Sequence, residues 1–199
     1  MQRINVWLFT VVFLLLAPMM LSHPVAAAPL DDAEKWFNEV TTLEARFVQV
    51  ASDGSYAEGT FYLKRPYRSR FDYDDPIALK LITTKLWLHV DEEDRRVVTS
   101  YPVSETPLSA ILNDPVSLRG DGFTTHGESR DGITIITIDN PEGEAAGRLV
   151  LEFSEKPLEL RRWVVTDANG ITTSVLLNNV IKGHALPASL FVPETYADQ

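Results

Sequence analysis

Hydrophobic and polar side chains alternate with a period of two residues along most of this chain, beginning just after Thr42. Leu43, Ala45 and Phe47 alternate with charged residues, which is the pattern of a β-strand with one buried face. A loop at residues 52–55, containing Asp53 and Gly54, then predicts a hairpin. The same rhythm predicts a return strand at 56–63 and further strands near residues 68–74, 77–82, 85–90, 95–100, 122–128, 132–139, 146–154, 158–167 and 170–182. About eleven short strands joined by tight turns predict an antiparallel sheet.

Two segments depart from this rhythm and predict helices. Near the start, Asp31 or Asp32 can cap a helix whose apolar stripe consists of Trp36, Phe37 and Val40. Later, residues 106–113 place apolar side chains at helical spacing behind Pro107, a residue suited to a first turn. The apolar positions of this second segment are Leu108, Ile111 and Leu112. We therefore expect a large curved sheet with helices over one face, an α+β fold that is mainly β.

The N-terminal segment has the pattern of a secretory signal. Arg3 precedes an apolar run, and small residues follow at Val25, Ala26 and Ala27. We predict cleavage after Ala27, which leaves one domain over residues 28–199 in an exported protein, most simply in the periplasm of a Gram-negative bacterium. The alternative is a retained membrane anchor, which the short run disfavours because spanning a bilayer takes about 20 apolar residues.

Composition excludes several classes of function. The 199 residues carry 18 Lys and Arg against 28 Asp and Glu, for a net charge of −10, and contain no cysteine. The negative charge argues against binding nucleic acid or an anionic lipid surface. Without cysteine the chain has no disulfide, thiolate metal site or catalytic thiol.

The sequence also gives no sign of catalysis or of a cofactor. The histidines His89, His126 and His184 lack metal-binding spacing, and neither a serine-hydrolase elbow nor a phosphate-binding glycine loop is present. Residues 91–94, and the cluster around Asp72 and Asp74, are interpreted as solvated charge at turns rather than as cation or acid–base sites. We therefore expect no enzyme activity, no metal and no cofactor.

The apolar side chains of the predicted strands outnumber what two short helices can cover. Large, partly closed antiparallel sheets with little to fill them tend to leave space for a ligand. The alternative is an ordinary packed core, to which such stripes usually belong. The candidate lining residues are Phe47, Phe61, Leu63, Phe71, Tyr73, Trp87, Leu149, Leu151, Phe153, Trp163, Val175 and Leu177.

Arg65 shares its strand parity with Phe61 and Leu63, so its guanidinium is predicted to point toward the apolar side. There it needs several acceptors, and backbone carbonyls at a helix end or in a covering loop can supply them. Arg65 would then act as a latch between the sheet and the cover. The alternative is a surface salt bridge at the corner before Pro66.

Several of these segments together resemble the outer-membrane lipoprotein carrier family, LolA. The resemblance is carried by Phe47-Val48-Gln49, the run Gly59-Thr60-Phe61-Tyr62-Leu63-Lys64-Arg65-Pro66, Arg70-Phe71-Asp72-Tyr73 and the helix-forming segment 106–112. It is strongest between Phe47 and Pro76. Two details depart from the family pattern: Thr83-Thr84-Lys85 precedes Trp87, and Ser69 replaces an aromatic residue.

The resemblance implies an incomplete, strongly curved β-barrel with a helical lid over a hydrophobic cavity for acyl chains. It implies a monomeric periplasmic carrier that is loaded by an inner-membrane ABC-type release complex and unloaded by an outer-membrane receptor. It also assigns the lid latch to Arg65. Two other functions stay open: a carrier of another lipid or glycolipid on the same fold, and a regulatory or sensor module that binds a protein partner.

Overall fold

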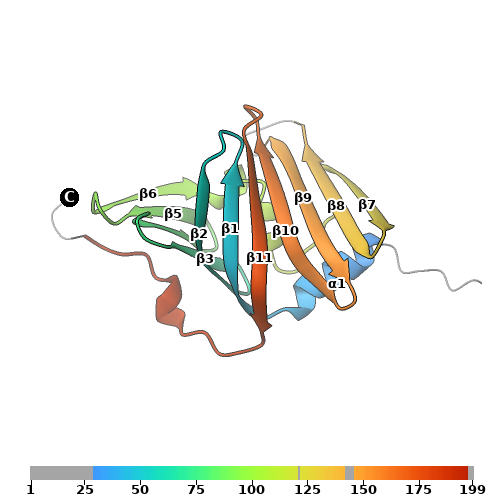
Figure 1. Ribbon diagram of the computed structural model, residues 1–199, viewed down its shortest axis with the longest axis horizontal. Coiled ribbons are helices and arrows are strands. Elements are labelled where there is room, and N and C mark those ends of the chain that lie inside the picture. The colour runs from blue at the N-terminus through green and yellow to red at the C-terminus, as the bar shows by residue number, and fades with distance from the viewer. Residues whose placement is uncertain (1–28, 121, 142–145, 197–199) are drawn as a thin grey trace, which may run out of the picture.

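The fold is built on one sheet of eleven antiparallel strands, which curves without closing into a barrel (Figure 1). This computed structural model describes residues 29–120, 122–141 and 146–196. The predicted signal sequence, residues 1–27, lies outside the described residues. The strands, β1 to β11 in chain order, are Thr42–Ala51, Tyr56–Lys64, Arg68–Tyr73, Leu79–Thr83, Trp87–Glu92, Val97–Pro102, Thr124–Arg130, Ile133–Asn140, Gly147–Glu155, Leu158–Asp167 and Thr172–Lys182. The predicted fold class and number of strands are confirmed.

The strand order explains how the concave face is covered. It runs β6-β5-β4-β3-β2-β1-β11-β10-β9-β8-β7, so the two edge strands β6 and β7 are consecutive in sequence but lie at opposite edges of the sheet. The chain between them must therefore cross from one edge to the other. We call residues 103–120 the crossover segment; it contains a 3₁₀ turn, Val103–Glu105, and the short helix α2, Ser109–Leu112.

The first helix provides the rest of the cover. Helix α1, Pro29–Glu39, contacts β7 and β8, and it buries Trp36 and Phe37. The prediction that Asp31 or Asp32 caps this helix is wrong: the helix already begins at Pro29, so both carboxylates lie in its first turn. There they still interact favourably with the helix dipole.

The main core lies between this cover and the concave face. Alternate residues of each long strand point inward, so Phe47 on β1, Leu151 on β9 and Phe153 also on β9 are almost completely buried. Strand β2 approaches β3 closely at Gly59. A Cβ atom at Gly59 would lie 2.1 Å from the carbonyl oxygen of Asp72 and 2.5 Å from the Phe47 ring. Glycine is required here because backbone and ring already fill the space.

A second, smaller apolar layer covers part of the outer face. After β11 the chain passes back across β3, through the 3₁₀ turn Ala188–Phe191 (Figure 1). Phe191 is 4% exposed and Ile82 on β4 is 1% exposed. Leu81, the neighbour of Ile82, packs against the main core. Ile82 therefore points to the outer face and is buried there. Arg70 donates to the carbonyl oxygen of Leu190 at 2.8 Å. We call residues 184–196 the C-terminal strap.

The strap also contacts the acidic segment 91–94, which is interpreted from the sequence as solvated. The sequence predicts a solvated Asp91, but this residue is fully buried on β5, and the Tyr196 hydroxyl donates to it at 2.7 Å. That hydrogen bond raises the pKa of Tyr196 to about 12. The prediction for Asp91 is wrong because a segment distant in sequence returns to cover it.

None of the helices in the described part of the chain is long and apolar enough to cross a membrane.

Candidate functional site

The inner surface of the sheet is lined by contacting aromatic rings. On one side, Phe61 and Phe71 lie with ring centroids 4.6 Å apart, and Trp163 lies 5.4 Å from Phe61. On the other, Trp36 and Phe37 of α1 meet Phe153 edge-on, at 5.4 and 5.8 Å. Apart from the tilted pair of Phe61 and Phe71, these rings meet edge-to-face, which is a favourable geometry for aromatic pairs. The cover is therefore held against the sheet mainly by apolar contact.

A cavity remains between the cover and the sheet, but it is small. Its volume is about 30 Å³, and a cavity needs about 10–15 Å³ by the same measure to hold one water molecule. Its lining residues come from both layers: Trp36, Phe37, Leu43, Phe61, Leu63, Ser69, Phe71, Leu108, Ile111, Leu112, Leu160 and Trp163. The space of ligand size that the sequence predicts is thus not open in this closed arrangement.

Most predicted lining and lid residues meet at this interface. The cavity is lined by nine of them: Phe61, Leu63, Phe71, Trp163, Trp36, Phe37, Leu108, Ile111 and Leu112. Others pack in the core around it: Phe47, Leu149, Leu151, Phe153, Val175 and Leu177 are buried, and Tyr73 packs against them. Tyr73 donates from its hydroxyl to Gln49 at 2.8 Å. Val40 is buried just beyond the end of α1 and lines a separate groove.

Trp87 is the exception, and its predicted place in the lining is wrong. It is 45% exposed. The register pairs Phe71 with Leu81 and Leu81 with Val90, and directly paired residues share a face of the sheet. Val90 therefore faces inward on β5, and Trp87 faces outward.

Three cavity residues were missed by the sequence reasoning. Leu43 and Ser69 share strand parity with Phe47 and Phe71, so the alternation could have identified them. Leu160 could not be found in this way. A bulge between Leu160 and Arg162 shifts the register of β10, so Leu160 and Trp163 both face inward although they are three residues apart.

Arg65 links the end of β2 to the crossover segment. Its Nη1 donates to the carbonyl oxygen of Ile111 at 2.8 Å, and its Nη2 donates to the carbonyl oxygen of Asn113. Burial lowers the pKa of the Arg65 guanidinium, and the nearby carboxylate of Asp114 acts in the opposite direction. An arginine stays charged in proteins, so both bonds have a cationic donor. The guanidinium thus reaches the carbonyls at the end of α2, as the sequence predicts.

Polar contacts also join the crossover segment to α1. Asn38 donates to the carbonyl oxygen of Val116 at 2.9 Å and accepts from its backbone N–H at 2.8 Å. The carboxylate of Glu34 accepts from the backbone N–H of Leu118 at 2.7 Å. Helix α1 and the crossover segment therefore form one cover, which we call the lid.

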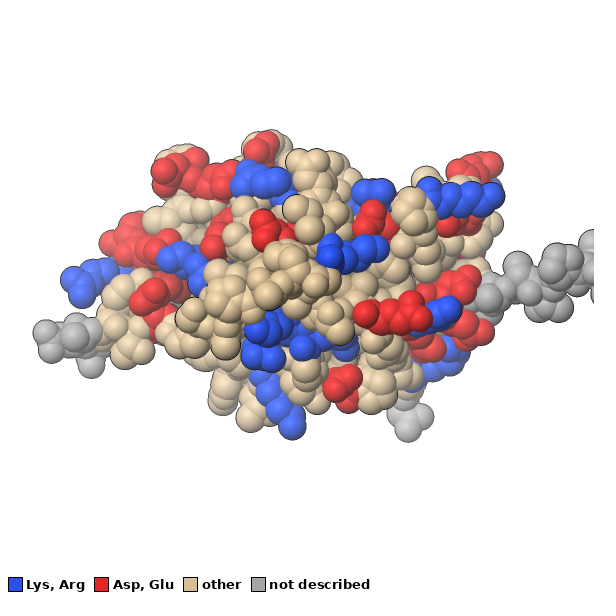
Figure 2. All heavy atoms as spheres, turned by 90° about the horizontal axis from the view of Figure 1, so that it is seen from below, with Lys and Arg blue, Asp and Glu red and all other residues tan. Residues whose placement is uncertain are grey.

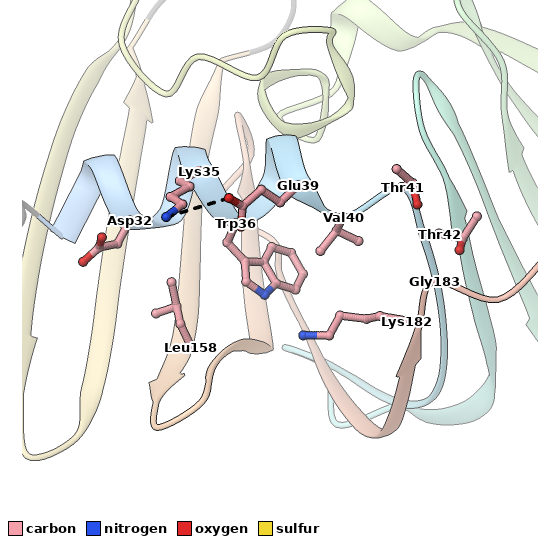
Figure 3. Close-up of a pocket in the computed structure, with 10 residues that line it drawn as sticks. All are labelled: Asp32, Lys35, Trp36, Glu39, Val40, Thr41, Thr42, Leu158, Lys182 and Gly183. Atoms are coloured by element: carbon pink, nitrogen blue, oxygen red, sulfur yellow. Dashed lines mark ion pairs between the residues drawn. The ribbon is translucent and has the colours of Figure 1, made fainter.

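An open groove lies beside this cavity, where the end of α1 passes the end of β11 (Figure 3). Its volume is about 510 Å³, and its walls combine apolar residues such as Val40 and Leu158 with charged residues such as Lys35 and Lys182. Trp36 lines both the groove and the inner cavity. On the face seen from below, several basic side chains lie together near the middle, and acidic and basic side chains are mixed toward both ends (Figure 2).

The site offers surface rather than reactive groups. In the described ranges, no group of three or more His, Asp or Glu side chains is placed to hold a metal ion. Ser69, which lines the cavity, hydrogen bonds through its hydroxyl to the hydroxyl of Thr83 at 2.8 Å. What this arrangement presents is an apolar surface enclosed between the sheet and its cover.

Comparison with known proteins identifies a matching family and relatives in sequence. Residues 38–194 match the family described as "Outer membrane lipoprotein carrier protein LolA". The outer-membrane lipoprotein carrier protein of Methylobacillus flagellatus is 25% identical over 195 residues, which is 92% of this chain and 93% of that protein. The protein of the same name from Methylococcus capsulatus is 26% identical over 194 residues, 90% of this chain and 91% of the relative.

Solved structures agree at the level of the fold. A DUF1329 family protein from Desulfovibrio piger superposes with a TM-score of 0.52 at 14% identity, covering 83% of this chain and 98% of that one. A conserved protein from Thermus thermophilus gives a TM-score of 0.51 at 14% identity, covering 85% of this chain and 94% of that one. These likenesses support the sheet architecture.

Proposed function

Because the chain belongs to the LolA family of outer membrane lipoprotein carrier proteins, we propose that it carries the acyl chains of lipoproteins between the sheet and the lid. Its route would run through the periplasm, from an inner-membrane ABC-type release complex to an outer-membrane receptor. The predicted signal sequence supports this location. The protein would act as a monomeric chaperone rather than as an enzyme.

One observation carries the proposal: a continuous apolar surface is closed by a lid that few polar bonds hold. Across the sheet–lid interface, the rings of Phe61, Phe71 and Trp163 face the side chains of α1 and α2. Arg65 supplies two hydrogen bonds, both to backbone carbonyls of the crossover segment. The backbone N–H of Tyr67 also donates to the carbonyl oxygen of Leu112 at 3.1 Å, and the Thr125 hydroxyl donates to that of Leu118. The side chains that line the cavity itself are almost all apolar, and an acyl chain can replace their contacts with contacts of the same kind.

The energetics explain why such a carrier is closed when empty. Burying a sixteen-carbon chain is worth about 12 kcal/mol, at about 0.8 kcal/mol for each methylene group. A permanently open cavity of matching shape would hold the cargo too tightly to release it. A lid that closes on the empty sheet competes with the cargo, because part of the binding energy must reopen the lid. The small cavity, about 30 Å³, supports a lid that is closed when no cargo is bound.

The proposal is tested with a synthetic lipopeptide. The purified protein is mixed with a diacylated lipopeptide, and complexes are counted by native mass spectrometry. We expect a one-to-one complex, and we expect no complex with the same peptide lacking acyl chains. Absence of lipopeptide binding, or equal binding of the bare peptide, would overturn the proposal. A glycolipid that co-purifies and outcompetes the lipopeptide would also overturn it in favour of another lipid cargo.

A further inference from the structure

We propose that the groove beside α1 receives the ester carbonyl groups that join acyl chains to the lipoprotein head, with the indole N–H of Trp36 as their hydrogen-bond donor. This inference rests on the proposed carrier function and assigns a position to the polar end of the cargo. The acyl chains would then extend from Trp36 into the space lined by Phe61 and Trp163.

Trp36 lies at the boundary between the two spaces. It lines both the groove and the inner cavity, and it is only 6% exposed. Indole is suited to such a boundary because it has a large apolar body and one polar N–H. A ligand that enters the cavity from the groove must pass this ring.

The Trp36 N–H has no acceptor among the described residues. Its Nε1 atom is buried without a hydrogen-bond partner, although a buried, unsatisfied donor costs about 1–3 kcal/mol. In Figure 3 the nitrogen lies on the edge of the ring nearest Lys182, a residue that also lines the groove. The chain thus retains a buried donor beside the groove, and an acceptor that enters between Trp36 and Lys182 would satisfy it.

The charges around the donor favour a neutral acceptor. The ammonium group of Lys182 lies 5.7 Å from the Trp36 ring centroid and is paired with Glu159 at 3.1 Å. Lys35 is paired with Glu39 at 3.8 Å. Because both lysines of the groove already have carboxylate partners, a neutral ester carbonyl adds the missing acceptor without leaving a charge unpaired.

The test combines a protein variant with a cargo variant. The probes are a diacylglyceryl lipopeptide with ester links and its dialkyl ether analogue, which has the same chains and peptide but lacks the two carbonyl oxygens. Trp36→Phe keeps an aromatic ring and removes the N–H. The smaller ring changes packing against both probes alike, so the readout is the ratio of ester to ether affinity. We expect this ratio to fall about fivefold to tenfold in Trp36→Phe, the value of one net hydrogen bond.

Trp163→Phe is the matched control, because Trp163 lines the inner cavity but not the groove. It is expected to change the affinity for both probes by the same factor. The proposal is overturned if Trp36→Phe also weakens both probes equally, since the ring would then act only by packing.

The wild-type protein supplies a test that does not depend on any variant folding. It should bind the ester lipopeptide about fivefold to tenfold more tightly than the ether analogue, by the same value of one hydrogen bond, and equal affinity would overturn the assignment of Trp36. Either result differs from failure of the carrier function itself, in which neither probe would bind.

Discussion

Removing the Arg65 guanidinium is expected to open the lid and strengthen cargo binding. In Arg65→Leu, the carbonyl oxygens of Ile111 and Asn113 lose their donor. A hydrogen bond from a charged donor contributes about 1.5–3 kcal/mol, and water replaces part of that at a half-buried group. We take the net loss for the two bonds as about 2 kcal/mol, which is a factor of about 30 in the equilibrium between closed and open lid.

The same factor of about 30 changes the affinity for cargo. When only the open form binds, the apparent Kd equals the intrinsic Kd divided by the open fraction. Arg65→Leu is therefore expected to lower the apparent Kd for a lipopeptide by about 30-fold at most and to slow its transfer to acceptor vesicles. Titration with a fluorescent lipopeptide measures the first effect. Hydrogen exchange of residues 103–120, which should become faster by a similar factor, measures the opening without cargo.

Two variants separate the latch from a general effect of charge. Arg65→Lys keeps the positive charge but loses the planar fork that reaches two carbonyls at once, so an intermediate effect is expected. Arg46→Leu removes an arginine from the outer face, where it pairs with Asp74, and should leave lid exchange unchanged. Lid exchange and lipopeptide affinity in Arg65→Leu that both stay within about twofold of wild type would refute the reasoning.

Three further perturbations test the packing on both faces of the sheet. Gly59→Ala is expected to destabilise the fold by about 1–3 kcal/mol in urea, because the new Cβ would meet a backbone oxygen at 2.1 Å; unchanged stability would contradict this close approach. Burial raises the pKa of Tyr73 to about 12, so the folded state retains that proton longer than the unfolded state. The free energy of unfolding should therefore fall between about pH 10 and pH 12, and Tyr73→Phe should reduce the fall without abolishing it, since Tyr196 also titrates there; a fall as steep as that of wild type would count against it. Phe191→Ala is expected to cost about 3–5 kcal/mol in thermal unfolding, against less than about 0.5 kcal/mol for the exposed Val192→Ala; equal losses would show that the strap does not pack as described.

The inward-facing residues could be predicted wherever only one face of the sheet is covered. On β1, β2, β9 and β11 the outer face meets water, so burial alternates cleanly, and Phe47, Phe61, Leu151 and Val175 follow from the period of two. Arg65 could be found for the same reason, because parity placed it at the end of an apolar row.

The alternation fails where both faces are covered. The C-terminal strap buries Ile82 and Asp91 on the outer face of β4 and β5, and the contacts of the strap join residues far apart in the sequence, such as Arg70 with Leu190 and Asp91 with Tyr196. No local sequence pattern in the strap predicts which strands it will cover. Trp87 was misplaced on this part of the sheet, because apolar residues there occupy both parities.

The size of the cavity could not be predicted from composition either, because it depends on where the lid lies. The same apolar residues, among them Phe61, Phe71 and Ile111, line a space of about 30 Å³ when the lid is closed, and they would line a larger one if it moved. Side-chain counts fix how much apolar surface is available, whereas the position of the lid decides whether the lid or a ligand covers it. In a carrier, the apolar surface would set the maximum affinity for cargo. A few lid bonds, such as those of Arg65, would set how far the observed affinity falls below that maximum. Affinity can then be adjusted at the latch without redesigning the core.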